Sequence, residues 1–383
     1  MTIAELHSNE ELRRHEFPVA ATKIFLGHAG VCALPRRVAE AIAHYTLNAT
    51  QGDQEALLPL MKIQRSRELA AKLLNAQPDE IAFVGPTTLA LGYVANGLKF
   101  RKSDNILIYH DDYPSNVYPW MALAERGVQV RLINVRELGK IRAIDVQGQV
   151  DENTRLVALA SCHFVSGWRL NLPAIGKFLR QRGVLFCVDG IQTLGAFPTT
   201  VEHIDFLAAD AHKWLLGPCA AGIFYVRKEL HDVLKPTVLG WNNVRCPNFV
   251  AQDTLAMRSG AHRYEAGSDN LLGLVGLTAA MEMLLEVGLD NIAAELLRQR
   301  AWLVPAIQER GYTVLQPAAP PENASGIVTF FKPNTDMKEL HAKLEAANIV
   351  TSLRADRAGQ QYVRLSPHFY NTDEELRRVI ELL

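Results

Sequence analysis

Short apolar runs alternate with longer helix-like stretches through the middle of the chain. Residues 81–84 (Ile-Ala-Phe-Val) form one such run, and an apolar helical stretch, 89–98, follows it after the turn Gly-Pro-Thr-Thr. Strands that alternate with helices at this spacing predict a mostly parallel sheet covered by helices on both faces. Further strand-like runs lie at 105–109, 128–133, 156–160, 184–188 and 204–208, and helix-like segments lie at 118–126 and 172–182.

The pattern changes after residue 270. A long apolar helix is expected over 271–287, in a position suited to joining two domains. A chain of 383 residues is long enough for two packed domains. The remaining segments read as helix, strand (326–331), helix (336–347), strand, strand (361–365), helix. We therefore predict an α/β protein with an N-terminal segment (1–20), a large domain (21–270), and a linking helix with a smaller α+β C-terminal domain (271–383).

Charge and cysteine content narrow the function classes. The formal net charge is −1, from 40 basic and 41 acidic side chains, so neither nucleic acid nor a membrane surface is expected as a partner. No apolar stretch reaches the length of about 20 residues that a membrane span needs, and the first 14 residues lack the features of a signal or transit peptide. The five scattered cysteines contain no C-x-x-C pair, which favours free thiols, a cytoplasmic location and no bound metal.

The first candidate for chemistry is Asp189, at the end of the apolar run 184–188. Ligands of open parallel sheets bind at the carboxyl ends of strands. A buried carboxylate there is costly unless a cation accompanies it, and the protonated pyridine nitrogen of pyridoxal-5′-phosphate (PLP) is such a cation. The alternative is an aspartate that only caps the next helix.

The second candidate is Lys213, which follows the run 204–208. Its neighbours are His212 and the apolar segment 214–218, which suggests an enclosed site. Desolvation there would lower the lysine pKa and make the amine nucleophilic. The alternative is a surface lysine whose apolar stem lies along the protein.

Together, the motifs Asp189-Gly190-Ile191-Gln192 and Asp210-Ala211-His212-Lys213 resemble those of the class V (fold type I) PLP-dependent aminotransferase superfamily. That superfamily includes class V aminotransferases, cysteine desulfurases, isopenicillin N epimerase-like proteins and kynureninases. The resemblance covers about residues 20 to 383. It implies PLP as cofactor, held by a Schiff base on one lysine.

The resemblance also implies a role for each cofactor-binding residue. Lys213 would form the Schiff base, Asp189 would pair with the pyridine nitrogen, and Gln192 would bond the ring hydroxyl. Tyr113 would stack on the ring. Thr87 and Thr88 of the turn 85–88, together with His212, would bind the phosphate at a helix N-terminus.

Three further segments carry implied roles outside this group. Ser268, in the segment 264–270, would reach the phosphate of a neighbouring subunit's cofactor, which implies a homodimer with shared sites. Arg364, in the segment 363–372, would bind the substrate α-carboxylate through its planar guanidinium; a solvated arginine on an edge strand is the alternative. His28 lies in a segment, 25–30, that lines the substrate pocket of relatives.

Two features depart from the pattern, and one residue has two interpretations. Asp210 stands where the family often has a serine, and a carboxylate has no proton to donate to a phosphate. It either pairs with another group or belongs to a differently arranged phosphate site. No cysteine follows Cys246, and the segment 351–361 lacks the thiol of a persulfide-forming desulfurase. His163 is a candidate general acid or base near the cofactor, or a histidine satisfied within the fold.

The sequence therefore predicts a PLP-dependent enzyme that acts at the Cα of an amino acid. Class V transamination is the first expectation. A C–S lyase or desulfurase-like enzyme without a cysteine relay, and an epimerase, are the alternatives. Outside enzymes, a degenerate PLP-binding regulatory protein is the competing hypothesis, against which Lys213, Asp189, Gln192 and Arg364 argue.

Overall fold

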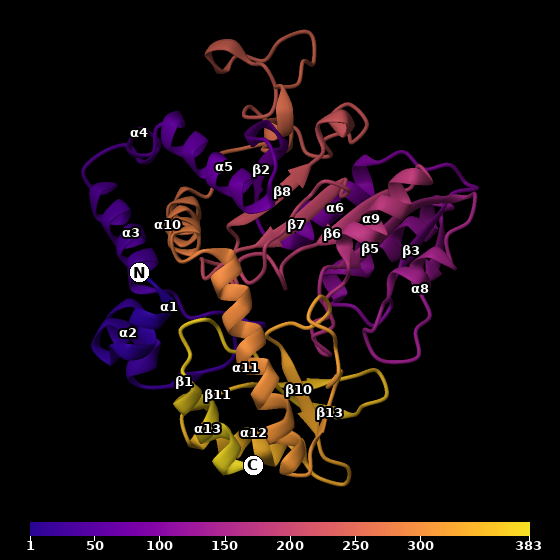
Figure 1. The fold of residues 1–383 in the computed structure, drawn as a ribbon. Coiled ribbons are helices and arrows are strands. Elements are labelled where there is room, and N and C mark those ends of the chain that lie inside the picture. The colour runs from indigo at the N-terminus through magenta and orange to yellow at the C-terminus, as the bar shows by residue number, and fades with distance from the viewer.

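The computed structural model describes residues 1–383, and its large domain is built on a seven-stranded sheet (Figure 1). The strand order is β2-β8-β7-β6-β5-β3-β4, with β8 antiparallel to both neighbours and every other pair parallel. The α/β fold with a mostly parallel sheet is thus confirmed. The strands are β2 (Ile81–Val84), β3 (Asn105–Ile108), β4 (Gln129–Leu132), β5 (Thr154–Ala160), β6 (Leu185–Asp189), β7 (Phe206–Asp210) and β8 (Gly222–Val226).

Apolar side chains cover both faces of this sheet, as the short apolar runs predict. In β6, Phe186 and Val188 belong to one core cluster, whereas Leu185 and Cys187 belong to the other. Successive side chains of a strand point to opposite faces, so one strand contributes to two cores. Helices close both sides: α3 (Arg36–Asn48), α4 (Gln54–Leu57), α5 (Leu60–Leu74), α6 (Thr87–Gly97), α7 (Tyr118–Met121), α8 (Ala143–Gln147), α9 (Leu172–Gln181) and α10 (Leu271–Val287).

The connection to the small domain differs from the expectation. α10 packs against α3 and α5 of the large domain, and it is the next helix, α11 (Leu289–Glu309), that runs into the small domain (Figure 1). The two helices meet at an angle of 75° around Gly288, whose φ of 90° suits a residue without a side chain.

No single helix is long and apolar enough to cross a membrane, although the bent pair of α10 and α11 reaches that length and apolarity together.

The small domain holds an antiparallel sheet of order β12-β13-β10-β9. β12 and β13 form a hairpin whose tip reaches the large domain, where Arg357 pairs with Asp111 at 2.7 Å. The elements are β9 (Thr313–Val314), β10 (Val328–Phe331), β12 (Ser352–Ala355), β13 (Gln361–Leu365), α12 (Met337–Ala346) and α13 (Asp373–Leu382).

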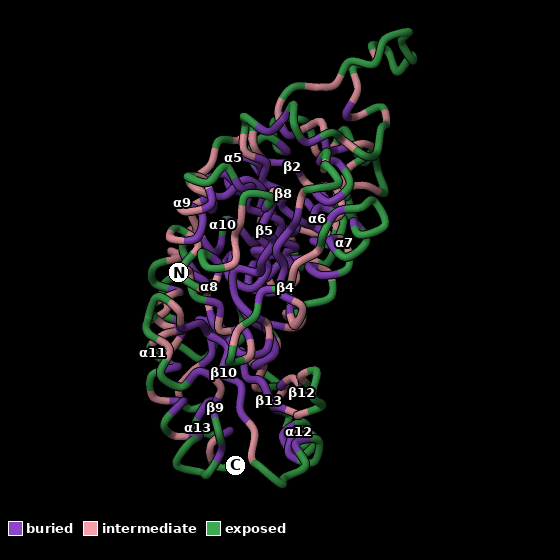
Figure 2. The backbone as a smooth tube through the Cα atoms, turned by 90° about the vertical axis from the view of Figure 1, so that its right-hand side faces the viewer, coloured by how far each residue is buried: buried purple, intermediate pink, exposed green.

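The N-terminal segment contacts both domains: Glu16 pairs with Arg37 of α3, and the segment also joins the small domain. β1 (Ile24–Phe25) pairs in parallel with β11 (Ile349–Val350). α1 (Ile3–Ser8) and α2 (Glu10–Glu16) precede it, and Arg13 of α2 pairs with Glu375 of α13 at 2.8 Å. Figure 2 shows the buried backbone continuing from the large sheet into this domain. The predicted boundary at residue 21 stays a prediction, and the residues on both sides of it contact the small domain.

Candidate active site

A cavity of about 270 Å³ lies at the carboxyl ends of β6 and β7 and is closed on one side by the β12–β13 hairpin. This is the edge where ligands of open parallel sheets bind. Residues from both domains line it, so neither domain forms the site alone. Eight of the predicted residues lie in its wall: Thr87, Thr88, Tyr113, Asp189, Gln192, His212, Lys213 and Arg364.

Lys213 stands three residues beyond the end of β7, and only 6% of its surface is exposed. Its Nζ lies 5.2 Å from the centre of the Tyr113 ring and belongs to no ion pair. Burial lowers the pKa of Lys213 to about 8; the carboxylate of Asp189 opposes this shift, and the guanidinium of Arg364 adds to it. About a tenth of the amine is therefore unprotonated at pH 7, far more than for an ordinary lysine, and able to act as a nucleophile.

Asp189 is the last residue of β6 and is buried. Its Oδ1 accepts a hydrogen bond from the backbone N–H of Ile191 at 3.0 Å, and no cationic side chain lies within ion-pair distance. Burial raises the pKa of the carboxyl group, because the protein itself offers no direct counter-ion. A buried carboxylate that faces a cavity and has no ion-pair partner of its own fits a ligand with a protonated ring nitrogen, as PLP has.

The opposite end of the cavity is suited to an anion. α6 begins at Thr87, so its first backbone N–H groups have no partner within the helix. The Thr87 Oγ1 accepts from the N–H of Asp210 at 2.9 Å, which leaves the hydroxyl proton free for a ligand. The Nδ1 of His212 donates to Asp210 at 2.8 Å, which leaves Nε2 free. The Thr88 hydroxyl donates to that of Ser115 at 2.8 Å, which leaves the Ser115 proton free. Together these donors fit a phosphate group.

Asp210, counted among the predicted cofactor-binding residues, does not line the cavity. Its two carboxylate oxygens accept from four donors, namely His212 Nδ1 and the backbone N–H groups of Ala211, Ala220 and Ala221. Burial disfavours the charged form of the Asp210 carboxyl group. The hydrogen bonds from His212 and from these N–H groups favour it more strongly, so the pKa of Asp210 is lowered. Asp210 is thus paired with other groups, and it fixes the orientation of His212.

Gln192 and Tyr113 both line the cavity, and contacts within the protein orient them. The side chain of Gln192 donates to the carbonyl of Ala29 at 3.1 Å and accepts from the indole of Trp214 at 3.0 Å. The Tyr113 ring packs edge-on against Phe164, with ring centres 5.5 Å apart. Both side chains therefore present a defined surface to the cavity.

Arg364 lies on β13 and has no exposed surface. Its Nη1 donates to the Phe164 carbonyl at 2.6 Å and its Nη2 to the Ser352 hydroxyl at 3.2 Å, while Nε has no partner. Burial, with the charge of Arg354 next in effect, lowers the pKa of Arg364 to about 9. A buried guanidinium without a carboxylate in its own chain fits a ligand that supplies one.

The comparisons with known proteins agree with this geometry. A profile described as aminotransferase class-V matches residues 24–379. The chain belongs to the class V aminotransferase family. The PLP prediction is confirmed with it, since the family depends on that cofactor.

The most similar relatives are named for sulfur chemistry more often than for transamination. A probable cysteine desulfurase of Methanothermobacter thermautotrophicus is 30% identical over 98% of this chain and 97% of its own length. The uncharacterized aminotransferase YcbU of Bacillus subtilis is 28% identical over 97% of this chain and 96% of its own. The apo structure of a cysteine desulfurase from Thermococcus onnurineus superimposes with a TM-score of 0.89, at 25% identity, covering 97% of this chain and 96% of that one.

Two predicted residues lie outside the cavity lining and are hydrogen-bonded within the protein. His163 accepts from the N–H of Ser166 at 3.0 Å through Nδ1 and donates to the Asp111 carbonyl at 2.9 Å through Nε2. Burial lowers its pKa to about 4. His28 is bonded at 2.9 Å to both the Ser366 carbonyl and the Tyr370 hydroxyl. Neither ring has a free nitrogen or lines the cavity, so this geometry does not support the predicted acid–base role of His163 or substrate contact of His28, and both stay predictions.

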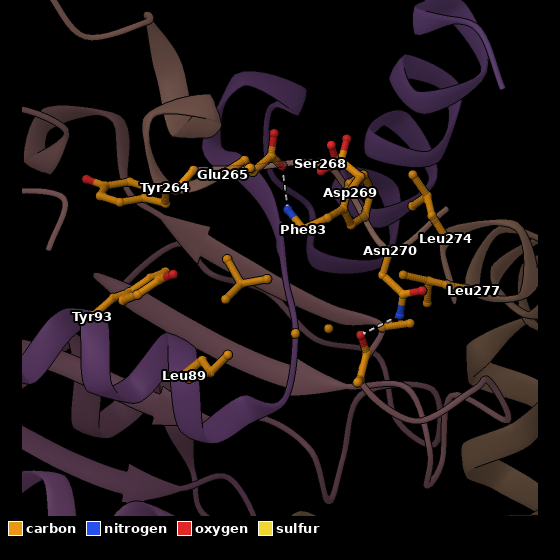
Figure 3. A pocket seen from close by; sticks show the side chains of 17 residues that line it. Phe83, Leu89, Tyr93, Tyr264, Glu265, Ser268, Asp269, Asn270, Leu274 and Leu277 are labelled. Carbon is orange, nitrogen blue, oxygen red and sulfur yellow. Dashed lines mark hydrogen bonds between the residues drawn. The ribbon is translucent and has the colours of Figure 1, made fainter. Parts of the chain in front are cut away.

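Ser268 lines a second cavity (Figure 3), which shares no lining residue with the cavity around Lys213. The loop from Tyr264 to Asn270 forms one side of that cavity, and Leu89 of α6 lies across from it. The Ser268 hydroxyl donates to Glu55 at 3.4 Å. Within one chain Ser268 does not reach the site, and its role toward a partner's cofactor stays a prediction.

Two residues of the site were missed in the sequence. Asp112 is buried; its carboxylate accepts from the N–H of Tyr113 at 2.7 Å and from that of Ala160 at 3.0 Å, and thereby positions the Tyr113 segment. Burial and the nearby Asp189 raise the pKa of Asp112 to about 7. Arg354 of β12 lines the cavity beside Arg364. Its only sequence signal was its place in the segment 351–361.

Proposed function

We propose that this protein is a PLP-dependent C–S lyase, which cleaves the Cβ–S bond of a sulfur-containing amino acid. One observation supports an amino acid as the substrate. A single cavity brings together the Lys213 amine, the Asp189 carboxylate and the buried Arg364, which has no carboxylate partner. The sulfur part is supported by the relatives named cysteine desulfurases. The earlier expectation of transamination is less well supported.

When bound, PLP supplies an electron sink for the bonds at the substrate Cα. Asp189 favours this by holding a negative charge at the end of β6. Arg364 binds the substrate carboxylate and so fixes which bond at Cα faces the cofactor. Lys213, with its lowered pKa, is suited to take a proton from Cα and to return one.

The cysteines support direct release of the sulfur product. None of the five lines the cavity. The β12–β13 hairpin, which borders the site, carries Arg354 and contains no thiol. An enzyme-bound persulfide would need a nucleophilic thiol within reach of the substrate, so we propose that sulfur leaves without one.

The test is a product analysis of the holoenzyme with L-cysteine, L-cystine and L-cysteine sulfinate. From L-cysteine we expect sulfide with pyruvate and ammonia, and from L-cystine cysteine persulfide with pyruvate and ammonia. From L-cysteine sulfinate we expect sulfite with alanine. A keto acid formed with the pyridoxamine form of the cofactor and no sulfur would mean transamination, and inversion alone would mean epimerisation; either result overturns the proposal. Cys219→Ser, which removes the most exposed thiol, serves as the control and should keep the rate.

A further inference from the structure

We propose that Arg354 binds an oxyanion on the substrate side chain, so that the site selects amino acids with two acidic groups. This inference rests on the proposed function for its choice of sulfur substrate. The carboxylate already assigned to Arg364 would be the first acidic group. The second would be a carboxylate or sulfinate at the end of a short side chain.

The hairpin register places the two arginines on one face. Ser352 stands opposite Arg364, and Arg354 stands opposite Tyr362. Residues two apart in a strand point to the same side, so Arg354 and Arg364 are diagonal neighbours across β12 and β13. A Cβ built on Gly30 would lie 3.6 Å from the Nη2 of Arg364 and 3.7 Å from that of Arg354. Both guanidinium groups therefore face the same small space beside Gly30.

Arg354 has almost no partner of its own. Its Nη1 donates to the carbonyl of Leu353 at 3.3 Å, and its Nε is buried without a partner. It belongs to no ion pair. Arg357, three residues further along the same hairpin, provides the contrast: its Nε donates to Asp111 at 2.7 Å and its Nη2 donates to the His110 carbonyl at 2.9 Å. One arginine of the hairpin thus anchors it, and the other is left for a ligand.

The nearby acidic groups are not available to Arg354. Asp189 lines the cavity and is assigned to the cofactor, while Asp112 lies outside the lining and already accepts from three N–H donors. The cations near the substrate position are Lys213, Arg354 and Arg364. A substrate with one carboxylate leaves this group with excess positive charge, whereas a second oxyanion would compensate it through charge-assisted hydrogen bonds.

This argument distinguishes among sulfur amino acids. The thiol of L-cysteine has an ordinary pKa of about 8.5, so it is mostly neutral at pH 7 and offers a guanidinium little. The sulfinate of L-cysteine sulfinate is a full anion of nearly the size of the L-aspartate carboxylate. L-Aspartate contains no sulfur and therefore reports binding without C–S cleavage.

The experiment is a spectral titration of the holoenzyme with L-cysteine sulfinate, L-aspartate, L-cysteine and L-alanine. We expect the two acidic amino acids to bind about tenfold or more tightly than the neutral ones, as a charge-assisted pair would give. Arg354→Gln should abolish this difference, and Arg354→Lys should restore part of it. Arg357→Gln, which removes a cation of the same hairpin outside the cavity, should preserve it.

Two results would overturn the inference. The first is a wild-type protein without preference for the acidic pair. The second is an Arg354→Gln variant that weakens all four ligands equally, because Arg354 would then share the α-carboxylate with Arg364. Failure of the proposed function is seen separately: no sulfur product would form from any sulfur amino acid, while the L-aspartate and L-alanine affinities would still decide the role of Arg354.

Discussion

The two walls of the cavity differ in how their polar groups are satisfied. The cofactor wall, formed by Thr87, Asp189, His212 and Lys213 of the large domain, is oriented by hydrogen bonds at strand ends. The hairpin wall, formed by Arg354 and Arg364, presents guanidinium groups whose Nε atoms have no partner. The first wall is built for one fixed cofactor. The second is completed only by a ligand, and we infer that it determines which substrate is accepted.

The largest expected effect comes from removing the amine of the cofactor wall. Lys213→Ala should lose the covalently held cofactor, seen as loss of the absorbance band that borohydride abolishes. Activity should fall about 10³-fold or more, because both attachment and proton transfer depend on this amine. Circular dichroism should show an unchanged fold. A surviving borohydride-sensitive band would refute the assignment of Lys213.

The hairpin wall is tested by Arg364→Lys, which keeps the charge but loses the planar fork. We expect kcat/KM for amino acids to fall about 10²-fold, because the lysine ammonium cannot form the paired hydrogen bonds of the guanidinium with the substrate carboxylate. The loss should be much smaller for cysteamine, which has no carboxylate. An equal loss for both substrates would show that Arg364 acts on the fold or the cofactor instead.

The two walls are coupled through the pKa of Lys213. The rate at which the apoenzyme takes up PLP should rise about tenfold per pH unit up to about pH 8 and then level off, because only the unprotonated amine attacks. The guanidinium charges lower this pKa, so Arg354→Gln and Arg364→Gln should each move the inflection to higher pH. Stopped-flow absorbance measures it. An inflection at the same pH in both variants would show that the two arginines do not affect the pKa of Lys213.

The smallest effect is expected for His163→Gln. Its ring is bonded on both nitrogens and lies behind the cavity wall, so the activity of the folded protein should change less than about threefold. Thermal stability should fall instead, because buried hydrogen bonds are lost. The activity is compared at equal PLP content. A loss of 10²-fold would restore His163 as an acid–base candidate.

Local sequence could predict the cofactor wall because its residues lie at strand ends within short motifs. Asp189 and Lys213 follow directly from apolar runs. The role of Asp210 could not be predicted, since its partners Ala220 and Ala221 precede β8, an antiparallel strand for which no prediction was made. The bonds of His28 join it to residues more than 330 positions away, which no local pattern reports.

The hairpin wall was only half predicted, for a reason of register. Arg364 stood in a recognisable motif, whereas Arg354 shares its face only because Ser352 pairs with Arg364. A shift of one residue would have pointed Leu353 into the cavity instead. Arg354 could be read in the sequence, but the face of the hairpin to which its side chain points depends on the register between β12 and β13, which no local pattern predicts.

The segment that connects the N-terminal strand to the cofactor wall is very short. Gly27 pairs with Ser366 of the small domain, and five residues later the N–H of Cys32 donates to the carbonyl of His212 at 2.7 Å. Gly30 lies between these two anchors, beside both guanidinium groups. Six residues of chain thus join a contact with the small domain to a hydrogen bond beside Lys213, so any displacement of the small domain would be transmitted to the backbone next to the cofactor lysine.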